Sequence, residues 1–247
     1  MTALGFFPSI LKEILTHIPT IAFKTVRWGE FLKRSKPILA QMTNPQQFQS
    51  QYLHLQQSLS PLLPPNMSFS QELSGEKSIK GEDLLFLYFS QLKSTDGVFL
   101  DLRPHHFSCY QDKTLWRPNF IWVKFEEPFR QSLIELYRGF YQEDDQLFSQ
   151  SLIKIGLGKN LSTNEFNELK TLFLNHFGEG DQTKVNFNLR IFQKSFTDLF
   201  QFFLKHKIVL ESDFLYLGVY LVSLYLHLEK NQQSYDVRGQ YLKVFSE

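Results

Sequence analysis

The chain has 247 residues, with 26 Lys plus Arg against 25 Asp plus Glu, which gives a formal charge of +1 at pH 7. Because nucleic-acid-binding proteins usually carry a clear basic excess, this balance argues against a nucleic-acid partner. Cys109 is the only cysteine, so an intramolecular disulfide and any zinc site built from several thiolates are excluded.

Hydrophobic residues make up 43% of the chain and aromatic residues 16%, including 26 Phe. This composition predicts a single domain with a dense aromatic core or an apolar contact surface. The most apolar stretch, Phe214 to Leu228, is shorter than the roughly 20 residues that span a bilayer, so we expect a buried helix there. The N-terminus lacks the basic region of a signal peptide. We therefore expect a cytoplasmic protein.

Residues 1–60 are predicted to form an N-terminal helical extension. Apolar residues recur at helical spacing from Ile10 to Ile18, and a second helical stretch runs from about Ile21 to Gln41. Pro37 is predicted to kink or divide that second stretch. A third helix is predicted to begin at Pro45 and to end near residue 59.

The same N-terminal segment has a basic balance, with six basic and two acidic residues in 1–60. Phe6, Phe7, Ile10 and Trp28 lie among them, so the segment is a candidate for peripheral contact with an anionic membrane surface. The alternative interpretation is a helical extension packed on the main domain.

Residues 61–80 are predicted to be a linker or loop. Pro61, Pro64 and Pro65 stop the preceding helix, and Ser, Asn, Gly and Lys residues follow. This is the one internal boundary that the composition indicates, and it leaves residues 81–247 as the main domain.

Two β segments are expected inside that domain, after a helix that ends near Ser94. Residues 97–102 read as a short buried strand, and residues 120–125 form the strongest β segment by their aromatic and β-branched content. Residues 110–119 would then be a hairpin-like connection between them.

Everything after Pro128 is predicted to be helical. Ser162 followed by Glu165 is a capping box, which marks the start of one of these helices. Two clear strands among about nine helices indicate a mainly α (α+β) fold with a small two- to four-stranded β element.

Residues 97–106 read G-V-F-L-D-L-R-P-H-H. This resembles the catalytic loop of the UbiB/AarF family of atypical kinase-like proteins, whose motif is H-A-D-x-H-P-G-N preceded by G-x-F. Asp101 falls on the family's catalytic aspartate and Pro104 on its proline. Phe99 stands in place of the first histidine, and His106 stands where the metal-binding asparagine belongs.

Residues 123–126 read V-K-F-E and occupy the place of the family's D-F-G-like motif. Lys124 replaces the aspartate that holds magnesium, and a cation is electrostatically wrong for a Mg²⁺ ligand position. The order of the later helices also resembles the family's tail. However, the interval between Phe69 and Leu84 leaves no room for a nucleotide-binding lobe.

The resemblance implies a degenerate, truncated kinase C-lobe-like domain that is not expected to bind ATP or magnesium. Asp101 would be a vestigial catalytic residue, and Arg103, His105, His106 and Lys124 are the candidate binding residues; no metal ligand is assigned. Lys124 either pairs with Asp101 in place of the lost magnesium or faces solvent. Asp101 itself is equally explained as the cap of a turn before a proline.

The favoured function is a non-catalytic, pseudokinase-like binding or regulatory protein. By resemblance it would be linked to isoprenoid quinone or lipid metabolism, with a protein or an apolar small molecule as its partner. One alternative is a helical interaction or structural subunit without kinase ancestry. Another is a metal-dependent enzyme that uses Asp101, His105 and His106, since His and Asp are zinc ligands, although adjacent histidines point apart on most backbones.

Overall fold

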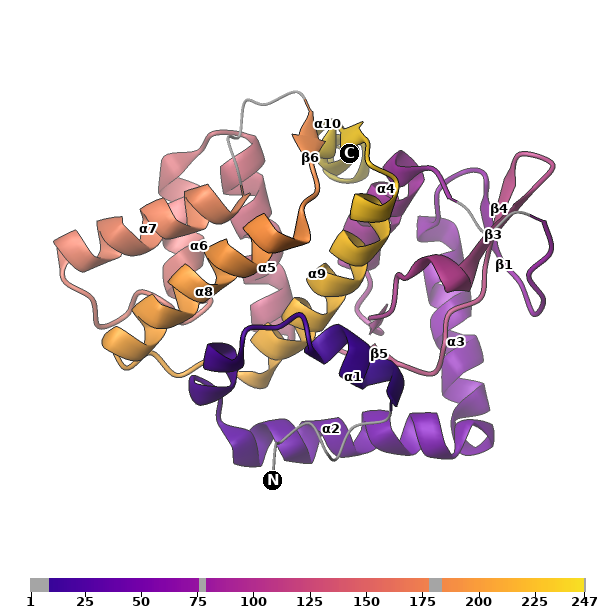
Figure 1. Ribbon diagram of the computed structural model, residues 1–247, viewed down its shortest axis with the longest axis horizontal. Coiled ribbons are helices and arrows are strands. Elements are labelled where there is room, and N and C mark those ends of the chain that lie inside the picture. The colour runs from indigo at the N-terminus through magenta and orange to yellow at the C-terminus, as the bar shows by residue number, and fades with distance from the viewer. Residues whose placement is uncertain (1–8, 76–78, 178–183, 247) are drawn as a thin grey trace.

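A computed structural model describes residues 9–75, 79–177 and 184–246 (Figure 1). In these ranges the fold is mainly helical with small strands, which confirms the predicted mainly α (α+β) class. The α-helices are α1 (Ser9–Leu15), α2 (Trp28–Thr43), α3 (Gln49–Leu59), α4 (Gly81–Gln91), α5 (Glu127–Tyr141), α6 (Asp145–Lys154), α7 (Thr163–Phe177), α8 (Leu189–Lys205), α9 (Ser212–Lys230) and α10 (Val237–Phe245).

The strands form three small sheets. A three-stranded sheet has the order β1-β4-β3, and two further pairs join β2 to β5 and β6 to β7. Short 3₁₀ turns, labelled η2 to η5, connect several elements. The strands and turns are η2 (Thr20–Lys24), η3 (Pro45–Phe48), η4 (Ser60–Leu62), β1 (Met67–Phe69), β2 (Val98–Phe99), η5 (Pro104–His106), β3 (Phe107–Tyr110), β4 (Lys113–Trp116), β5 (Trp122–Val123), β6 (Val185–Asn186) and β7 (Ser234–Tyr235).

Helix α9 lies at the centre of the molecule. It contacts α1, α2, α4 and α8, and Figure 1 shows these helices around it. Tyr220 and Val222 on α9 are fully buried, which confirms the prediction of a buried helix. Within the described ranges, no helix is both long enough and apolar enough to cross a membrane.

The many Phe side chains form the core of the protein. In the part of the chain that the structure describes, no Phe side chain is exposed. Rings stack or meet edge to face, as Phe192 does with Phe196 at 4.7 Å between centroids, and such pairs add to the stability from burial. The fully or nearly buried Phe residues are Phe31, Phe89, Phe99, Phe107, Phe125, Phe129, Phe140, Phe148, Phe173, Phe192, Phe196, Phe200, Phe202 and Phe203.

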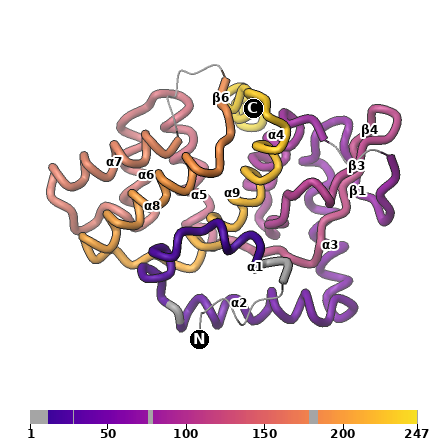
Figure 2. The backbone as a smooth tube through the Cα atoms, in the orientation of Figure 1, coloured from indigo at the N-terminus to yellow at the C-terminus, as the bar shows by residue number. Residues whose placement is uncertain are grey.

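The described part of the N-terminal extension packs on the rest of the chain. Figure 2 shows α2 along one edge of the molecule and α1 between α2 and α9. Ile14 and Leu15 of α1 belong to the common core, and Arg34 of α2 forms an ion pair with the buried Asp213 of α9 at 2.6 Å. Apolar side chains of both helices are therefore part of the common core, whereas Leu32 of α2 is exposed.

The candidate membrane-contact residues of the N-terminus fall partly outside what the structure describes. Phe6 and Phe7 lie outside the described residues, and so do the side chains of Ile10 and Trp28. Peripheral membrane contact through residues 1–60 stays a prediction.

The helical stretch expected from about Ile21 to Gln41 is divided before Trp28 and not at Pro37. Its first residues form the separate turn η2, and α2 then runs without a break from Trp28 to Thr43 with Pro37 inside it. Pro37 and Lys33, whose carbonyl loses its helical partner, are both exposed, so water can bind that carbonyl and the helix tolerates the proline.

The predicted linker contains a strand, which is a correction. Met67–Phe69 pairs in parallel with Lys113–Trp116, and the Phe69 ring stacks on Trp116 at 5.0 Å. The partner strand lies more than forty residues further along the chain, so the local Pro- and Ser-rich composition gave no indication of it.

The capping box is confirmed, since the Ser162 N–H donates to the Glu165 carboxylate at 2.7 Å.

Candidate functional site

The pairing of β2 with β5 sets the position of Asp101. The two strands are antiparallel, with Val98 opposite Val123, and the N–H of Leu100 donates to the carbonyl of Ile121 at 3.0 Å. Asp101 follows directly and is 1% exposed. A carboxylate so deeply buried needs nearby charge or hydrogen-bond compensation.

Lys124 does not provide that compensation, so the proposed ion pair between Lys124 and Asp101 is wrong. In an antiparallel pair, the residue after β2 and the residue after β5 lie at opposite ends. Lys124 is exposed beyond the far end, where its carbonyl accepts a hydrogen bond from Arg34 at 3.2 Å. Asn119 approaches Asp101 instead, and its Nδ2 donates to Oδ2 at 2.8 Å.

Arg103 neutralises Asp101 directly. Its Nε donates to Oδ1 at 2.8 Å and its Nη2 to Oδ2 at 2.7 Å, in a bidentate arrangement, and its backbone N–H donates to Oδ1 at 3.2 Å. Arg103 is 4% exposed and also forms an ion pair with Glu13 of α1. The predicted binding residue therefore acts as the counter-ion of Asp101.

His106 also contacts the Asp101 carboxylate, at the oxygen that accepts from Arg103 and Asn119. Its Nε2 lies 3.0 Å from Oδ2, and its Nδ1 lies 3.0 Å from the carbonyl oxygen of Arg117. Because a carbonyl only accepts, Nδ1 must carry a proton. The ring is thus fixed in orientation by the β4–β5 connection.

Asp101 is a poor general base in this environment. Burial alone would raise the pKa of its carboxyl, but hydrogen bonds from Arg103 and His106 outweigh burial and hold that pKa well below its usual range. Since a general base works best with a pKa near the operating pH, the arrangement does not suit proton abstraction by Asp101.

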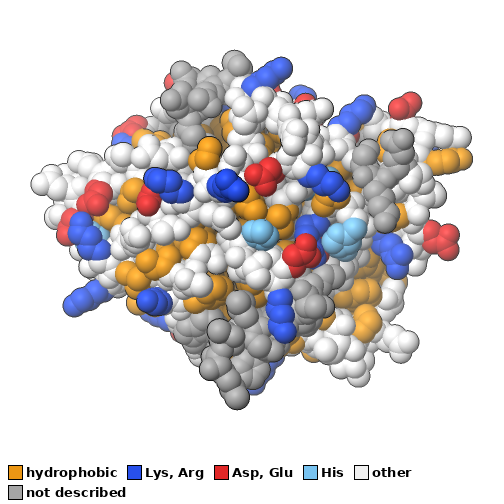
Figure 3. All heavy atoms as spheres, in the orientation of Figure 1, with side chains coloured by type: hydrophobic (Ala, Val, Ile, Leu, Met, Phe, Trp, Pro, Cys, Tyr) orange, Lys and Arg blue, Asp and Glu red, His pale blue; other side chains and the backbone are white. Residues whose placement is uncertain are grey.

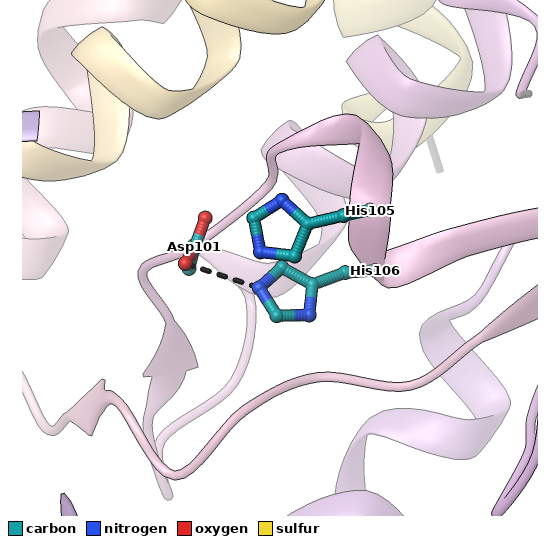
Figure 4. Close-up of side chains that lie close together, drawn as sticks. All are labelled: Asp101, His105 and His106. Carbon is teal, nitrogen blue, oxygen red and sulfur yellow. Dashed lines mark ion pairs between the residues drawn. The ribbon is translucent and has the colours of Figure 1, made fainter. Parts of the chain in front are cut away.

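His105 lies beside His106, contrary to the expectation that the two rings point apart. The 3₁₀ turn η5 brings their centroids to 4.0 Å, and Figure 4 shows both rings on one side of Asp101. One ligand atom from each of Asp101, His105 and His106 lies within 4.8 Å of the others. His105 is exposed at its surface, but partial burial of its ring, followed by the charge of His106, lowers its pKa, so its imidazole is neutral at pH 7.

A cavity of about 610 Å³ opens beside these side chains. Figure 3 shows His side chains together with acidic and basic ones on the face of the molecule that carries α1 and η5. Such a volume is within the range of small-molecule sites. The cavity is lined by Gln49, Tyr52, Gln56, Phe69, Ser70, Gln71, Leu73, His105, His106, Arg117, Pro118, Asn119 and Phe120.

Sequence reasoning missed two residues of this site, Asn119 and Arg117. Arg117 is exposed on the cavity wall, and among the described residues its guanidinium has no hydrogen-bond or ion-pair partner. Both residues lie in the connection between the two predicted β segments, and no local sequence pattern indicated that this connection returns to Asp101 at Asn119.

Known proteins give no assignment for this chain. No protein-family model matches it, and no curated protein matches it. The resemblance to the UbiB/AarF family therefore stays a prediction, and the functional argument depends on the geometry of the site.

Proposed function

We propose that the protein is a non-catalytic binding protein whose cavity takes a small organic acid, with one negative charge on a planar or apolar body. The observation that carries the proposal is the unpaired guanidinium of Arg117 next to an aromatic wall. Asp101 does not line the cavity and is already neutralised by Arg103.

The charge of the cavity favours a monoanion. Its lining contains no Lys, Asp or Glu, and His105 is neutral because its pKa is lowered mainly by burial. Arg117 is thus the only Lys or Arg side chain among the lining residues, all of which lie within the described ranges. Guanidinium groups bind carboxylate, sulfonate or phosphate oxygens through paired hydrogen bonds.

The opposite wall favours a planar or apolar body. Tyr52 and Phe120 stack at 4.4 Å with an angle of 14° between their rings, and Phe69 adds a third ring to the lining. The exposed amides of Gln49 and Gln71 supply adaptable hydrogen bonds at the rim. This combination of apolar surface with few polar groups is typical of small-molecule sites.

The absence of catalysis is supported by the chemistry of Asp101 and Lys124. Asp101 is held ionised by Arg103 with a pKa far from neutrality, and Lys124 is a cation where the related motif needs a metal ligand. The link to quinone or lipid metabolism is part of the same proposal and depends on the family resemblance alone. An organic acid with an apolar body is compatible with it.

Binding of 8-anilinonaphthalene-1-sulfonate, a monoanion on an aromatic body, tests the proposal. We expect saturable fluorescence enhancement with the wild-type protein and about 10- to 100-fold weaker binding for Arg117→Ala, because a charge-assisted hydrogen bond contributes about 1.5–3 kcal/mol. Arg190→Ala is the matched control, since Arg190 is also exposed but lies on α8 away from the cavity.

Equal affinity for the wild type and the Arg117→Ala variant would contradict the assignment of the cavity. Absence of saturable binding to the folded wild type would favour the helical interaction or structural subunit. Competition by benzoate and by phenyl phosphate then separates a carboxylate preference from a phosphate preference.

Mg-ATP is expected to leave the thermal midpoint of unfolding unchanged at millimolar concentration. The triphosphate carries several negative charges against one free guanidinium, and a ligand that binds the native state must raise its stability. Differential scanning fluorimetry measures this, with ATP alone and magnesium alone as controls. A dose-dependent rise of the midpoint with Mg-ATP would overturn the pseudokinase-like proposal.

A further inference from the structure

The Nε2 atom of His106 faces Asp101. Its Nδ1 must donate to the Arg117 carbonyl at 3.0 Å, so in the neutral ring Nε2 is an acceptor. The Nδ2 of Asn119 lies 3.2 Å from that Nε2 and 2.8 Å from Oδ2 of Asp101. One amide can thus donate to both atoms and hold them in place.

In the neutral tautomer, two electron-rich atoms therefore face each other at 3.0 Å, Nε2 of His106 and Oδ2 of Asp101. Such a contact is favourable when a proton or a metal ion neutralises it. In a tetrahedral zinc site with bonds of about 2.0–2.1 Å, neighbouring ligand atoms are about 3.3 Å apart. The observed separation is close to that spacing.

The hydrogen-bond partners of His106 and Asp101 resemble those that surround the ligands of a metal site. The other nitrogen of a metal-binding histidine usually donates to a carbonyl or a carboxylate, which fixes the tautomer. His106 has such a contact with Arg117. Arg103 donates to both oxygens of Asp101 and Asn119 donates to Oδ2, which fixes the carboxylate with Oδ2 facing His106.

His105 supplies a third ligand atom. It lies on the cavity wall next to His106. One ring nitrogen of each histidine and one carboxylate oxygen of Asp101 fall within 4.8 Å of one another (Figure 4). Two imidazoles and one carboxylate are ligands that zinc accepts in three-residue sites.

We propose that Asp101, His105 and His106 bind one divalent cation of the zinc class, with a further coordination position open to the cavity. The nitrogen ligands exclude magnesium and calcium, which prefer oxygen. The competing explanation of the same geometry is a protonated His106 in an ion pair with Asp101. This inference does not depend on the organic-acid proposal, because the metal needs neither Arg117 nor the aromatic wall.

Titration of the full chain with Co²⁺, after dialysis against a chelator, tests the metal site. We expect one equivalent to bind, with visible d–d absorption, and Zn²⁺ to displace it. Because His105 is exposed, His105→Ala should fold like the wild type and bind Co²⁺ at least tenfold more weakly. The control is His54→Ala, since the His54 side chain is 70% exposed on α3.

Three results would overturn the metal site. These are no binding to the wild type below about 100 µM, equal affinity of the wild type and the His105→Ala variant, or loss of binding in His54→Ala. Ring ¹⁵N NMR adds a second measurement. If Zn²⁺ leaves the Nε2 signal of His106 unchanged, the protonated ion pair with Asp101 is the correct explanation.

The two proposals can fail separately. Anilinonaphthalene sulfonate binding and its loss in Arg117→Ala are measured with the chelator present, where no divalent cation contributes. Co²⁺ binding is measured without the dye. Binding of the dye without binding of Co²⁺ would support the organic-acid cavity and contradict the metal site. Binding of Co²⁺ without binding of the dye would support the metal site and contradict the organic-acid cavity.

Discussion

Replacing Arg103 with Met is expected to destabilise the protein by about 3–5 kcal/mol at neutral pH, because the substitution leaves the carboxylate of Asp101 buried without its counter-ion. Asp101 is 1% exposed, and Arg103 donates to both of its oxygens. For a chain of this size the loss corresponds to roughly 10 °C in thermal midpoint. Urea denaturation and calorimetry measure it.

The destabilisation should shrink as the pH is lowered from neutrality toward the unfolded pKa of Asp101, about 3.9. In the wild type the folded pKa of Asp101 lies below its unfolded value, so the stability it contributes is present above the unfolded pKa of about 3.9 and is lost only in stronger acid. In Arg103→Met, burial is the largest remaining influence and raises the pKa. The variant's folded state then takes up a proton on acidification, which relieves the penalty.

Arg117→Met is the matched control for this prediction. Both substitutions remove one guanidinium from the same region, but Arg117 is exposed and without a partner among the described residues. Its replacement is expected to change stability by less than about 0.5 kcal/mol. If Arg103→Met changed stability as little as Arg117→Met, or if its destabilisation did not vary with pH, the ion pair between Arg103 and Asp101 would not be a main contribution to stability.

Replacing Gly139 with Ala is expected to destabilise the protein by about 3 kcal/mol or more, although alanine normally stabilises a helix interior by about 1 kcal/mol relative to glycine. A Cβ built at Gly139 of α5 would lie 2.5 Å from the backbone nitrogen of Phe148 in α6. Backbone atoms cannot move aside like a flexible side chain, so the α5–α6 contact must open.

Gly29→Ala provides the control, because Gly29 is exposed on α2 and a Cβ there would meet nothing within 4 Å. We expect that variant to be as stable as the wild type or up to about 1 kcal/mol more stable. Thermal unfolding of the two variants in parallel measures the difference. A neutral Gly139→Ala would mean that α5 and α6 do not pack as closely as described.

The helical part of the fold was accessible from sequence because its signals are local. Ser162 and Glu165 form the predicted capping box, and the apolar run of residues 214–228 is the central buried helix. Apolar periodicity and caps act over three or four neighbouring residues, so they can be recognised without knowledge of the rest of the chain. The Phe content also predicted a dense core, which the packing confirms.

The site could be predicted only in part, because some of its contacts join residues that are distant along the chain. The sequence identified Asp101, Arg103, His105 and His106 as one candidate cluster, because they are close along the chain. It left Lys124 either paired with Asp101 or facing solvent, and the structure shows Lys124 exposed. The antiparallel register of β2 and β5 places Lys124 at the far end and brings Asn119 to Asp101.

By itself, therefore, the sequence determined the helical class, the caps, the buried central helix and the membership of the Asp–Arg–His cluster. Only the tertiary structure decided that Arg103 is a counter-ion rather than a free binding residue, and that β1 joins the strand at 113–116. It also decided that Arg117 is the unpaired charge of the cavity. These facts depend on contacts between segments distant in sequence, and local patterns carry no information on strand register or on the direction of a paired strand.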